Sequence, residues 1–399
     1  MDKKILIATF SLWEDRRTPI NGMVEPMLSF FLPKTDELDL IDGFHPGSNN
    51  VITRIESYKE KKLLSVKTSL VSMLLYPMLK LQNKNATQIF FKIRDFLAVF
   101  EWAIRAKKKY DLFIGLESVY TAAGIFLKKL GIVKQVVYYV SDYSPNRYKN
   151  KWFNSIYLGL DRFCAKNADF IWDVSSAMQK ARIKAGLNKE KSSPVILVPN
   201  ALFPKQMDPL PLSKTIPFSI VYAGTLTPGN GADIAVQAMP EILDKFPKAT
   251  LHIFGSNGAD QARIKHLIKK NNLEKQVIFH GFIKDTTDIT RAINKYQIGV
   301  APYLNITGSH RKYGDATKLR LYTGAGLPII TTDVPPLGRQ LQKFGAALIT
   351  KDDPKALAET TIELFLNKKE YLNMRQKAIE FAKNNTWRNV YDNALRQMR

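Results

Sequence analysis

Short buried strands that alternate with helical segments restrict the fold of this 399-residue chain more than any other feature. Apolar runs of strand length occur at 5–10, 39–41, 111–115, 135–140, 170–174 and 195–199, with helical patterns between most of them. A second alternating series begins at Phe218. Such alternation predicts parallel sheets with helices on both faces. We therefore expect an α/β protein built from two doubly wound, Rossmann-like domains that face one another across a cleft.

A proline-rich stretch separates the two series. Residues 202–216 contain Pro204, Pro209 and Pro211 and lack any periodicity, which is typical of a linker. The length also suits two domains of about 200 residues each. We expect an N-terminal domain at 1–201, a linker at 202–217, a C-terminal domain at 218–385 and a final helix at 386–399.

The run from Lys318 to Asp333 predicts a short helix, a glycine turn and a buried strand. Lys318 and Tyr322 are four residues apart and so share one face of the helix. Gly324 and Gly326 allow a sharp turn before the strand. Ligands of open α/β sheets bind where such loops meet the strand ends, and a fixed cation there suits a phosphate. The alternative is an ordinary helix-to-strand connection that ends in a glycine cap.

With the segments around it, this run resembles the donor-sugar half of GT-B glycosyltransferases. The pattern of their large retaining family is Lys-Leu-x-Glu-Tyr-x-Ala-x-Gly-x-Pro-Val-Ile. Five further segments follow the family order: Ile220-Val-Tyr-Ala-Gly-Thr-Leu, Leu251-His-Ile-Phe-Gly, Val277-Ile-Phe-His-Gly-Phe, Ile298-Gly-Val-Ala-Pro-Tyr and Asn385-Thr-Trp. The resemblance implies a nucleotide-sugar donor, expected to be uridine-linked, and a last helix that returns to the N-terminal domain. The donor contacts that it implies are Gly224, Thr225, Gly255, Phe282, Tyr303, Arg311, Lys318 and Tyr322.

Two departures from the family pattern affect the donor site. The acid that holds the donor ribose falls at Leu321, whose side chain cannot accept a hydrogen bond. The family's basic pair falls near Thr225 and Asn230, neither of which is charged. The donor phosphates would therefore depend on Lys318, on backbone N–H groups near Gly224, and on Arg311 or Lys312.

Acidic residues follow two strands of the N-terminal half. Asp142 comes directly after the strand that ends at Val140, and Glu117 follows the strand that ends at Gly115. Catalytic residues gather at the carboxyl ends of parallel strands, so Asp142 is the first candidate to orient or deprotonate an acceptor hydroxyl and Glu117 the second. The alternative for Asp142 is a helix cap or an Asx turn.

The loop after the first strand offers acceptor contacts. Trp13, Asp15 and Arg16 combine an aromatic ring for stacking on a sugar with one acid and one base. The family usually has glycines in this loop, so a different acceptor contact is expected.

A metal site is not expected. The chain contains no Asp-x-Asp motif, and its five histidines are scattered singly. Cations and backbone donors would then stabilise the leaving nucleoside diphosphate, with no metal and no other cofactor.

The net charge of +23 calls for an anionic partner. Residues 51–110 hold 13 Lys or Arg against 4 Asp or Glu, interspersed with long aliphatic and aromatic residues such as Leu74, Met78, Phe91 and Trp102. Basic and apolar residues mixed on helices favour binding to an anionic membrane surface. The alternative is a solvated basic face over an ordinary core. Nucleic acid is not expected, because no nucleic-acid-binding signature occurs.

Nothing in the sequence suggests secretion or a membrane span. The first residues form a strand rather than a signal peptide, the longest uncharged apolar segment of the first half has 12 residues, and Cys164 is the only cysteine. A cytoplasmic protein, peripheral on the inner face of the plasma membrane, is expected.

These observations favour a glycosyltransferase that moves a sugar from a nucleotide donor to a lipid-linked or polysaccharide acceptor. The alternatives are a nucleotide-sugar epimerase of the same fold and a non-catalytic GT-B partner subunit, which Leu321 would suit. Retention and inversion both stay open, since some inverting relatives, such as the bacterial glucuronosyltransferase that builds xanthan, also pair a strand-end Asp with a donor-side Lys.

Overall fold

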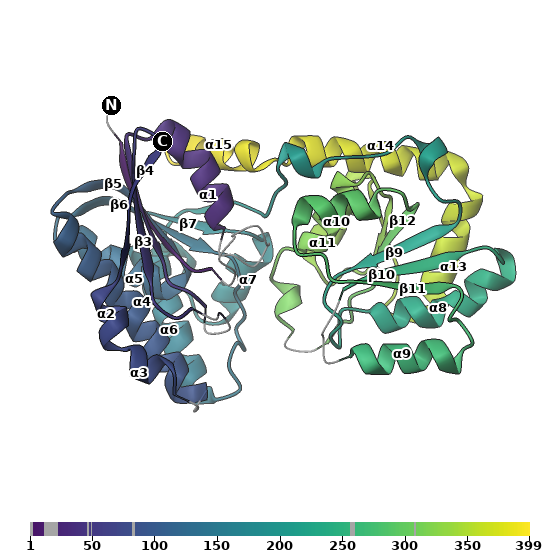
Figure 1. Ribbon diagram of the computed structural model, residues 1–399, viewed down its shortest axis with the longest axis horizontal. Helices are drawn as coiled ribbons and strands as arrows, with labels where there is room; N and C mark the ends of the chain where they lie inside the picture. The colour runs from purple at the N-terminus through teal and green to yellow at the C-terminus, as the bar shows by residue number, and fades with distance from the viewer. Residues whose placement is uncertain are drawn as a thin grey trace. The chain divides into compact units, whose positions relative to one another are not determined.

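The computed structural model describes residues 3–11, 23–45, 48, 50–81, 84–255, 260–306 and 309–399. The chain divides into two compact units, the first made of residues 1–198 and 391–399 and the second of residues 199–390. Each unit is built around a single sheet flanked by helices (Figure 1).

The sheet of the first unit has eight strands in the order β4-β3-β2-β1-β5-β6-β7-β8. All neighbours from β2 to β8 pair in parallel, whereas β3 and β4 form an antiparallel extension at one edge. The strands are β1 (Lys4–Thr9), β2 (Glu37–Asp42), β3 (Arg54–Lys59), β4 (Lys62–Thr68), β5 (Tyr110–Leu116), β6 (Val133–Val140), β7 (Phe170–Asp173) and β8 (Val195–Leu197). The central strands are buried on both faces, as a parallel sheet between helical layers requires.

Helices α4, α5 and α6 pack side by side, and aromatic contacts from Phe96 to Phe126 and from Phe126 to Phe163 join them. The helices of this unit are α1 (Val24–Phe31), α2 (Leu70–Leu74), α3 (Tyr76–Leu79), α4 (Lys84–Ala106), α5 (Glu117–Lys129), α6 (Lys151–Asn167) and α7 (Ser176–Lys184), with the 3-10 turns η1 (Leu32–Lys34) and η2 (Lys189–Lys191). Tyr391, near the chain end, packs on Phe30, Phe31 and Trp172. The last nine residues thus belong to the first unit.

The sequence suggested that the basic segment 51–110 is helical, but the structure shows that only part of it is. Its first part is the β3–β4 hairpin, whose two-residue turn at Glu60 and Lys61 has positive φ at both positions. Phe91 and Trp102, two of the apolar residues suggested for a membrane surface, are buried in the core of the unit, as is Leu79. Leu74 and Met78 are exposed, by 81% and 43%, so only part of the segment can meet a partner.

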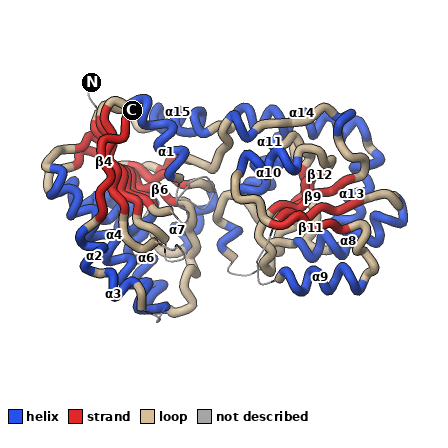
Figure 2. The backbone as a smooth tube through the Cα atoms, viewed as in Figure 1, coloured by secondary structure: helices blue, strands red, loops and turns tan. Residues whose placement is uncertain are grey.

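The second unit contains a six-stranded, wholly parallel sheet in the order β11-β10-β9-β12-β13-β14 (Figure 2). Its strands are β9 (Ser219–Ala223), β10 (Thr250–Phe254), β11 (Val277–Gly281), β12 (Ile298–Ala301), β13 (Ile329–Thr331) and β14 (Ala347–Ile349). The strand order reverses between β9 and β12, and ligands of such sheets bind at the carboxyl ends of the strands beside this point.

Two apolar clusters cover the faces of this sheet, one under α8 and α13 and one under α11 and α12. The helices are α8 (Ala232–Lys245), α9 (Gln261–Lys270), α10 (Thr286–Ile293), α11 (Thr317–Gly324), α12 (Pro336–Phe344), α13 (Pro354–Leu366) and α14 (Lys368–Asn384), with the 3-10 turns η3 (Pro204–Gln206), η4 (Leu212–Lys214) and η5 (His310–Lys312). The last helix, α15 (Trp387–Gln397), begins in this unit, and its residues from 391 onward belong to the first unit. The prediction of an α/β protein with two doubly wound sheets is confirmed.

Residues 202–217 are not a free linker. They pack on the second unit, where Asp208 N donates to the carbonyl of Gly324 at 3.1 Å and Asn294 Nδ2 donates to the carbonyl of Asp208 at 2.7 Å. Gly324 lies inside α11, and a Cβ atom there would meet the carbonyl oxygen of Gln206 at 2.6 Å. This glycine therefore serves close packing, while Gly326, at φ 70°, makes the turn. In the described part of the chain, no helix is long and apolar enough to span a membrane.

Candidate active site

A buried lysine without a carboxylate partner marks the carboxyl edge of the second sheet. Lys318, in the first turn of α11, is only 9% exposed, and no described carboxylate lies within ion-pair distance of it. Its Nζ donates to the Tyr222 hydroxyl at 3.1 Å and lies 4.2 Å from the Tyr222 ring centre and 4.6 Å from that of Tyr303. Burial, and secondarily the charge of Arg311, lower the pKa of Lys318 to about 7.

The local sequence explains this position of the lysine. Gly224 ends β9 with φ 153°, and a Cβ atom there would lie 2.9 Å from the lysine Nζ. The absence of a side chain therefore lets the ammonium group reach the backbone at the end of β9. Tyr222, the second-last residue of β9, places its ring beneath the ammonium group. A cation over the face of an aromatic ring is stabilised in its charged form.

A second cation comes from the loop after β12. Arg311 Nε donates to Asn230 Oδ1 at 2.7 Å, and its Nη2 donates to Thr227 Oγ1 at 3.4 Å. Asn230 also holds the first glycine loop, because its Nδ2 donates to the carbonyl of Thr225 at 2.8 Å. Asn230, which lies near the family's basic position, thus orients Arg311, which comes from a different loop.

The remaining donor candidates lie on strand ends at the same edge. Thr225 is exposed beside Gly224, and Tyr303 is buried against Lys318. Gly255 ends β10, where its N donates to the carbonyl of Gly281 and a Cβ atom would meet the carbonyl of Gly224 at 2.1 Å. Phe282 follows β11 with 58% of its surface exposed, so its ring is available for stacking.

Tyr322 does not belong with this group. It is fully buried, and its hydroxyl accepts from Ala223 N at 2.8 Å and donates to the carbonyl of Val300 at 3.0 Å. It therefore bridges β9 and β12 at the reversal of strand order, which makes it a support for the site. Leu321 packs in the apolar cluster under α11 and α12, so the family's ribose-binding acid has no equivalent at this position.

In the first unit, Glu117 occupies a tight turn between β5 and α5. Its φ is 66°, an unfavourable value for a residue with a side chain, and such strain is concentrated at functional positions. Gly115 makes the turn possible, since a Cβ atom there would meet Thr121 N at 2.7 Å. The Thr121 hydroxyl donates to the carbonyls of Gly115 and Glu117, which fixes the first turn of α5.

One oxygen of Glu117 is anchored. Oε1 accepts from Ser141 Oγ at 2.7 Å, Ser141 N at 3.1 Å and Asp142 N at 3.2 Å. No described residue donates to Oε2. Burial raises the pKa of the Glu117 carboxyl, and the positive charge of Arg147 opposes that rise. A carboxylate with one fixed oxygen, one open oxygen and a raised pKa is suited to accept a proton.

Asp142 lies beside Glu117 in a different environment. Its side chain is 46% exposed, and Oδ2 accepts from Arg147 Nη1 at 2.8 Å. The same Nη1 binds the carbonyl of Asp142, so the arginine closes a local loop. Both acids lie at this edge of the sheet, and Asp142 is engaged in an ion pair with Arg147, whereas Oε2 of Glu117 has no donor among the described residues. Trp13, Asp15 and Arg16 lie outside the described residues.

Comparison with protein families identifies the chemistry of the second unit. Residues 217–367 match the model of the family described as glycosyl transferases group 1. This part of the chain is similar to that family, which supports a glycosyltransferase. The match covers Gly224, Arg311 and Lys318, and the prediction of a glycosyltransferase is confirmed at this level. No curated protein sequence matches the chain.

Solved structures with the same fold are glycosyltransferases of the GT-B class. Sucrose-phosphate synthase from Thermosynechococcus elongatus is 14% identical, with 100% of this chain and 99% of that chain covered and a TM-score of 0.70. HepE of Anabaena, solved in complex with UDP, is 15% identical, with 100% and 99% covered and a TM-score of 0.67. The pneumococcal O-GlcNAc transferase GtfA, solved with UDP and GlcNAc, is 16% identical, with 89% and 65% covered and a TM-score of 0.58. At these identities the likeness establishes the GT-B fold of this glycosyltransferase.

The roles of two residues in the cluster around Lys318 could not be predicted from the sequence. Tyr222 was quoted only as part of a strand, although it carries the ring under Lys318. Asn230 was noted only as the loss of a base. A contact between strands, or between a loop and a distant arginine, leaves no local pattern in the sequence.

Proposed function

We propose that this glycosyltransferase binds a UDP-linked sugar through its diphosphate at Lys318 and Arg311. The observation that carries the proposal is the buried ammonium group of Lys318, which has no carboxylate among the described residues and lies beside a second cation. Burying an uncompensated charge is costly, so the site is built for an anion that arrives with the substrate. The complexes of HepE and GtfA with UDP support a uridine nucleotide.

In this proposal Arg311 replaces the basic pair that the family carries in its first glycine loop. Asn230 and Thr227 orient its guanidinium from that loop. A planar guanidinium can bind two oxygens of one phosphate, and Lys318 can bind the other phosphate as a point charge. Phe282 would offer its exposed ring to the uracil base.

We further propose that transfer needs no metal. The described residues contain no group of three His, Cys, Asp or Glu side chains that could hold a metal ion. Lys318 and Arg311 would stabilise the charge that develops on the leaving diphosphate. Turnover that persists in excess EDTA supports this, and a requirement for added Mg²⁺ or Mn²⁺ contradicts it.

Thermal-shift measurements with a panel of nucleoside diphosphates test the donor proposal. A ligand at 100 times its dissociation constant stabilises the folded protein by ~2.7 kcal/mol. UDP should raise the melting temperature more than ADP, GDP or CDP, and UMP should have a smaller effect because it lacks the second phosphate. Equal shifts for UDP and UMP would exclude the diphosphate as the main contact.

On the acceptor side we propose Glu117 as the base, ahead of Asp142. Its open Oε2 would take the proton of an acceptor hydroxyl while that oxygen bonds to the anomeric carbon. The bond from the anomeric carbon to the diphosphate oxygen breaks, and the nucleotide leaves with the electron pair. Direct displacement of this kind inverts the anomeric configuration.

Two matched amide substitutions decide between the acids. Glu117→Gln should lower turnover by about 10²–10⁴-fold with little change in UDP affinity, because it removes the basic oxygen and keeps the shape. Asp142→Asn should have a much smaller effect, since Oδ2 of Asp142 is already occupied by Arg147. A dead Asp142 variant beside an active Glu117 variant would reverse the assignment.

The acceptor is proposed to be lipid-linked or a polysaccharide, reached from an anionic membrane at the cytoplasmic face. Several helices of the first unit carry exposed apolar residues, and α2 and α3 both pack on α4. These exposed residues include Leu74 and Met78 on α2 and α3, Ile93 on α4, and Trp152, 66% exposed, at the start of α6. Lysines 80, 92, 149 and 151 are exposed among them, and these residues form the proposed membrane surface. Apolar side chains with interspersed lysines are what binding at a lipid interface requires.

The β3–β4 hairpin offers a control of equal charge. Lys59 pairs with Glu37 at the amino end of β2, so the hairpin turn lies at the opposite edge of the sheet from α2. Replacing Lys80, Lys92, Lys149 and Lys151 by glutamine should release the protein from vesicles of anionic lipid, at ~1 kcal/mol per well-placed lysine. Replacing Lys59, Lys61, Lys62 and Lys107 should have little effect, because Lys107 lies before the amino end of β5, at the same edge as the hairpin turn. Equal release by both quadruple variants would contradict the proposed surface and indicate a non-specific effect of net charge.

A further inference from the structure

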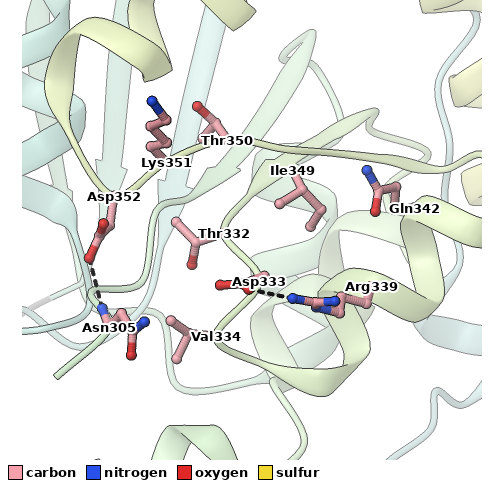
Figure 3. A pocket seen from close by; sticks show the side chains of 10 residues that line it. All are labelled: Asn305, Thr332, Asp333, Val334, Arg339, Gln342, Ile349, Thr350, Lys351 and Asp352. Carbon is pink, nitrogen blue, oxygen red and sulfur yellow. Dashed lines mark hydrogen bonds and ion pairs between the residues drawn. The ribbon is translucent and has the colours of Figure 1, made fainter. Parts of the chain in front are cut away.

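A polar pocket opens at the carboxyl ends of β13 and β14, one strand beyond the Lys318 site (Figure 3). Its volume is about 480 Å³, within the range of ligand sites. The loop after β12, the loops after β13 and β14, and helix α12 line it. Its lining shares no residue with the cluster around Lys318, and the Thr332 hydroxyl at its edge donates to the carbonyl of Tyr303 at 2.7 Å.

The charges of the pocket balance. Asp333 and Asp352 provide two carboxylates, and Arg339 and Lys351 provide two cations. Arg339 Nη2 donates to Asp333 Oδ2 at 2.6 Å, and Asp352 Oδ2 accepts from Asn305 N at 2.9 Å. A free anion would meet both carboxylates and a free cation would meet both bases, so the lining favours an uncharged ligand.

The rest of the lining narrows the class of ligand. Carboxylate oxygens accept, guanidinium and ammonium groups donate, and the Gln342 amide does both. Val334 and Ile349 add an apolar surface between these groups. A saccharide matches this combination, because each hydroxyl both donates and accepts while the ring C–H faces are apolar. We propose that the pocket binds an uncharged saccharide, independently of the donor diphosphate. The inference does not depend on which nucleotide or acceptor the enzyme uses.

Saturation-transfer NMR on the full chain, with saturating UDP present, tests the proposal. The probes are the methyl glycosides of glucose, galactose, mannose and N-acetylglucosamine. At least one should receive saturation from the protein, and inorganic phosphate should not displace it. Asp333→Ala and Arg339→Ala should each weaken that glycoside by about tenfold or more, because each removes hydrogen bonds to a charged group. Both residues are largely exposed, so neither substitution should impair folding.

The control is Lys343→Ala, on the same helix but outside the pocket lining, which should leave glycoside binding unchanged. UDP affinity should be the same in all three variants. The proposal is overturned if none of the glycosides binds at millimolar concentration, or if phosphate displaces the bound one. It is also overturned if the pocket variants weaken UDP in parallel, since the pocket would then be part of the donor site.

Discussion

Arg182 and Lys318 are both buried cations beside tyrosine rings, one in each unit, but among the described residues only Arg182 is paired with carboxylates. Arg182, on α7, binds Asp173 through Nη1 at 2.7 and 2.9 Å and Asp161 through Nε at 3.1 Å, and all three side chains are about 1% exposed. Lys318 has two aromatic rings, a tyrosine hydroxyl and another cation as neighbours. The compensated charge belongs to the folded structure, whereas the uncompensated one is available to a ligand.

The largest loss of stability is expected when the cation that compensates two buried carboxylates is removed. Arg182→Met would leave two buried carboxylates without their cation, and breaking a buried ion pair in this way costs about 3–5 kcal/mol. Urea unfolding of the first unit should show that loss. The matched control is Arg162→Met on α6, whose guanidinium binds only a backbone carbonyl in a half-buried position. Similar losses in both variants would mean that the Asp161–Arg182–Asp173 network is not special.

Lys318→Met should have the opposite effect to Arg182→Met, because it should weaken ligand binding without lowering stability. The substitution removes a charge that pays a desolvation cost in the free protein, so the free energy of unfolding should stay the same or rise. UDP affinity should fall by about 1.5–3 kcal/mol, the worth of a hydrogen bond to a charged group. Calorimetric titration measures it, with Lys355→Met on the exposed side of α13 as the control. An unchanged dissociation constant would exclude Lys318 from the donor site.

The positions of Lys318 and Gly224 could be predicted from the sequence, but the contacts that surround the two buried cations could not. The Lys318–Asp333 run and the glycine after β9 follow periodicity and turn rules, so Lys318 and Gly224 were placed together. The spacing of Lys318 and Tyr322 gave their shared helix face but not the depth of Tyr322, whose hydroxyl reaches between β9 and β12. The network of Arg182 joins α6, β7 and α7, and no local pattern encodes such a contact.

The β3–β4 hairpin was missed for a different reason. Its turn residues, Glu60 and Lys61, both have positive φ, yet neither is the glycine or asparagine that signals such a turn. Its lysines then suggested a solvated or membrane-facing helix. The strand β14, Ala347–Ile349, was also not predicted.

The lowered pKa of Lys318 predicts that donor binding depends on pH. Because it is lowered to about 7 in the free protein, the ammonium group is mostly neutral at pH 8, and a bound diphosphate must restore its proton. UDP-glucose, whose diphosphate does not titrate near neutrality, should bind about tenfold more weakly at pH 8 than at pH 6. Proton uptake on binding, measured by calorimetry in buffers of different ionisation enthalpy, checks this. The facing groups Tyr222 and Tyr303 have raised pKa values and stay neutral, so the dependence should vanish in Lys318→Met.

The smallest effect concerns a buried base without a charged partner, His252 on β10. Its ring stacks on Tyr296 and lies 2.9 Å, through Nδ1, from Nε2 of His280. Burial, and then the charges of His280 and Lys295, lower the pKa of His252 to about 4, so the folded protein keeps it neutral while the unfolded chain takes up a proton below about pH 6.5. The contribution of neutral His252 to the stability of the second unit is thus fully present above that pH and is lost as the pH falls toward 4.

Urea unfolding should show a loss of about 1 kcal/mol for the second unit between pH 7.5 and pH 5.5. His252→Gln removes the titrating ring and should flatten this dependence, whereas His266→Gln, at an exposed position on α9, should leave it intact. If the His252 variant loses as much stability as the wild type over the same range, the titration lies elsewhere. Lys318 would then be the one buried base of this unit whose lowered pKa has a measurable consequence, and that consequence would be in donor binding rather than in folding.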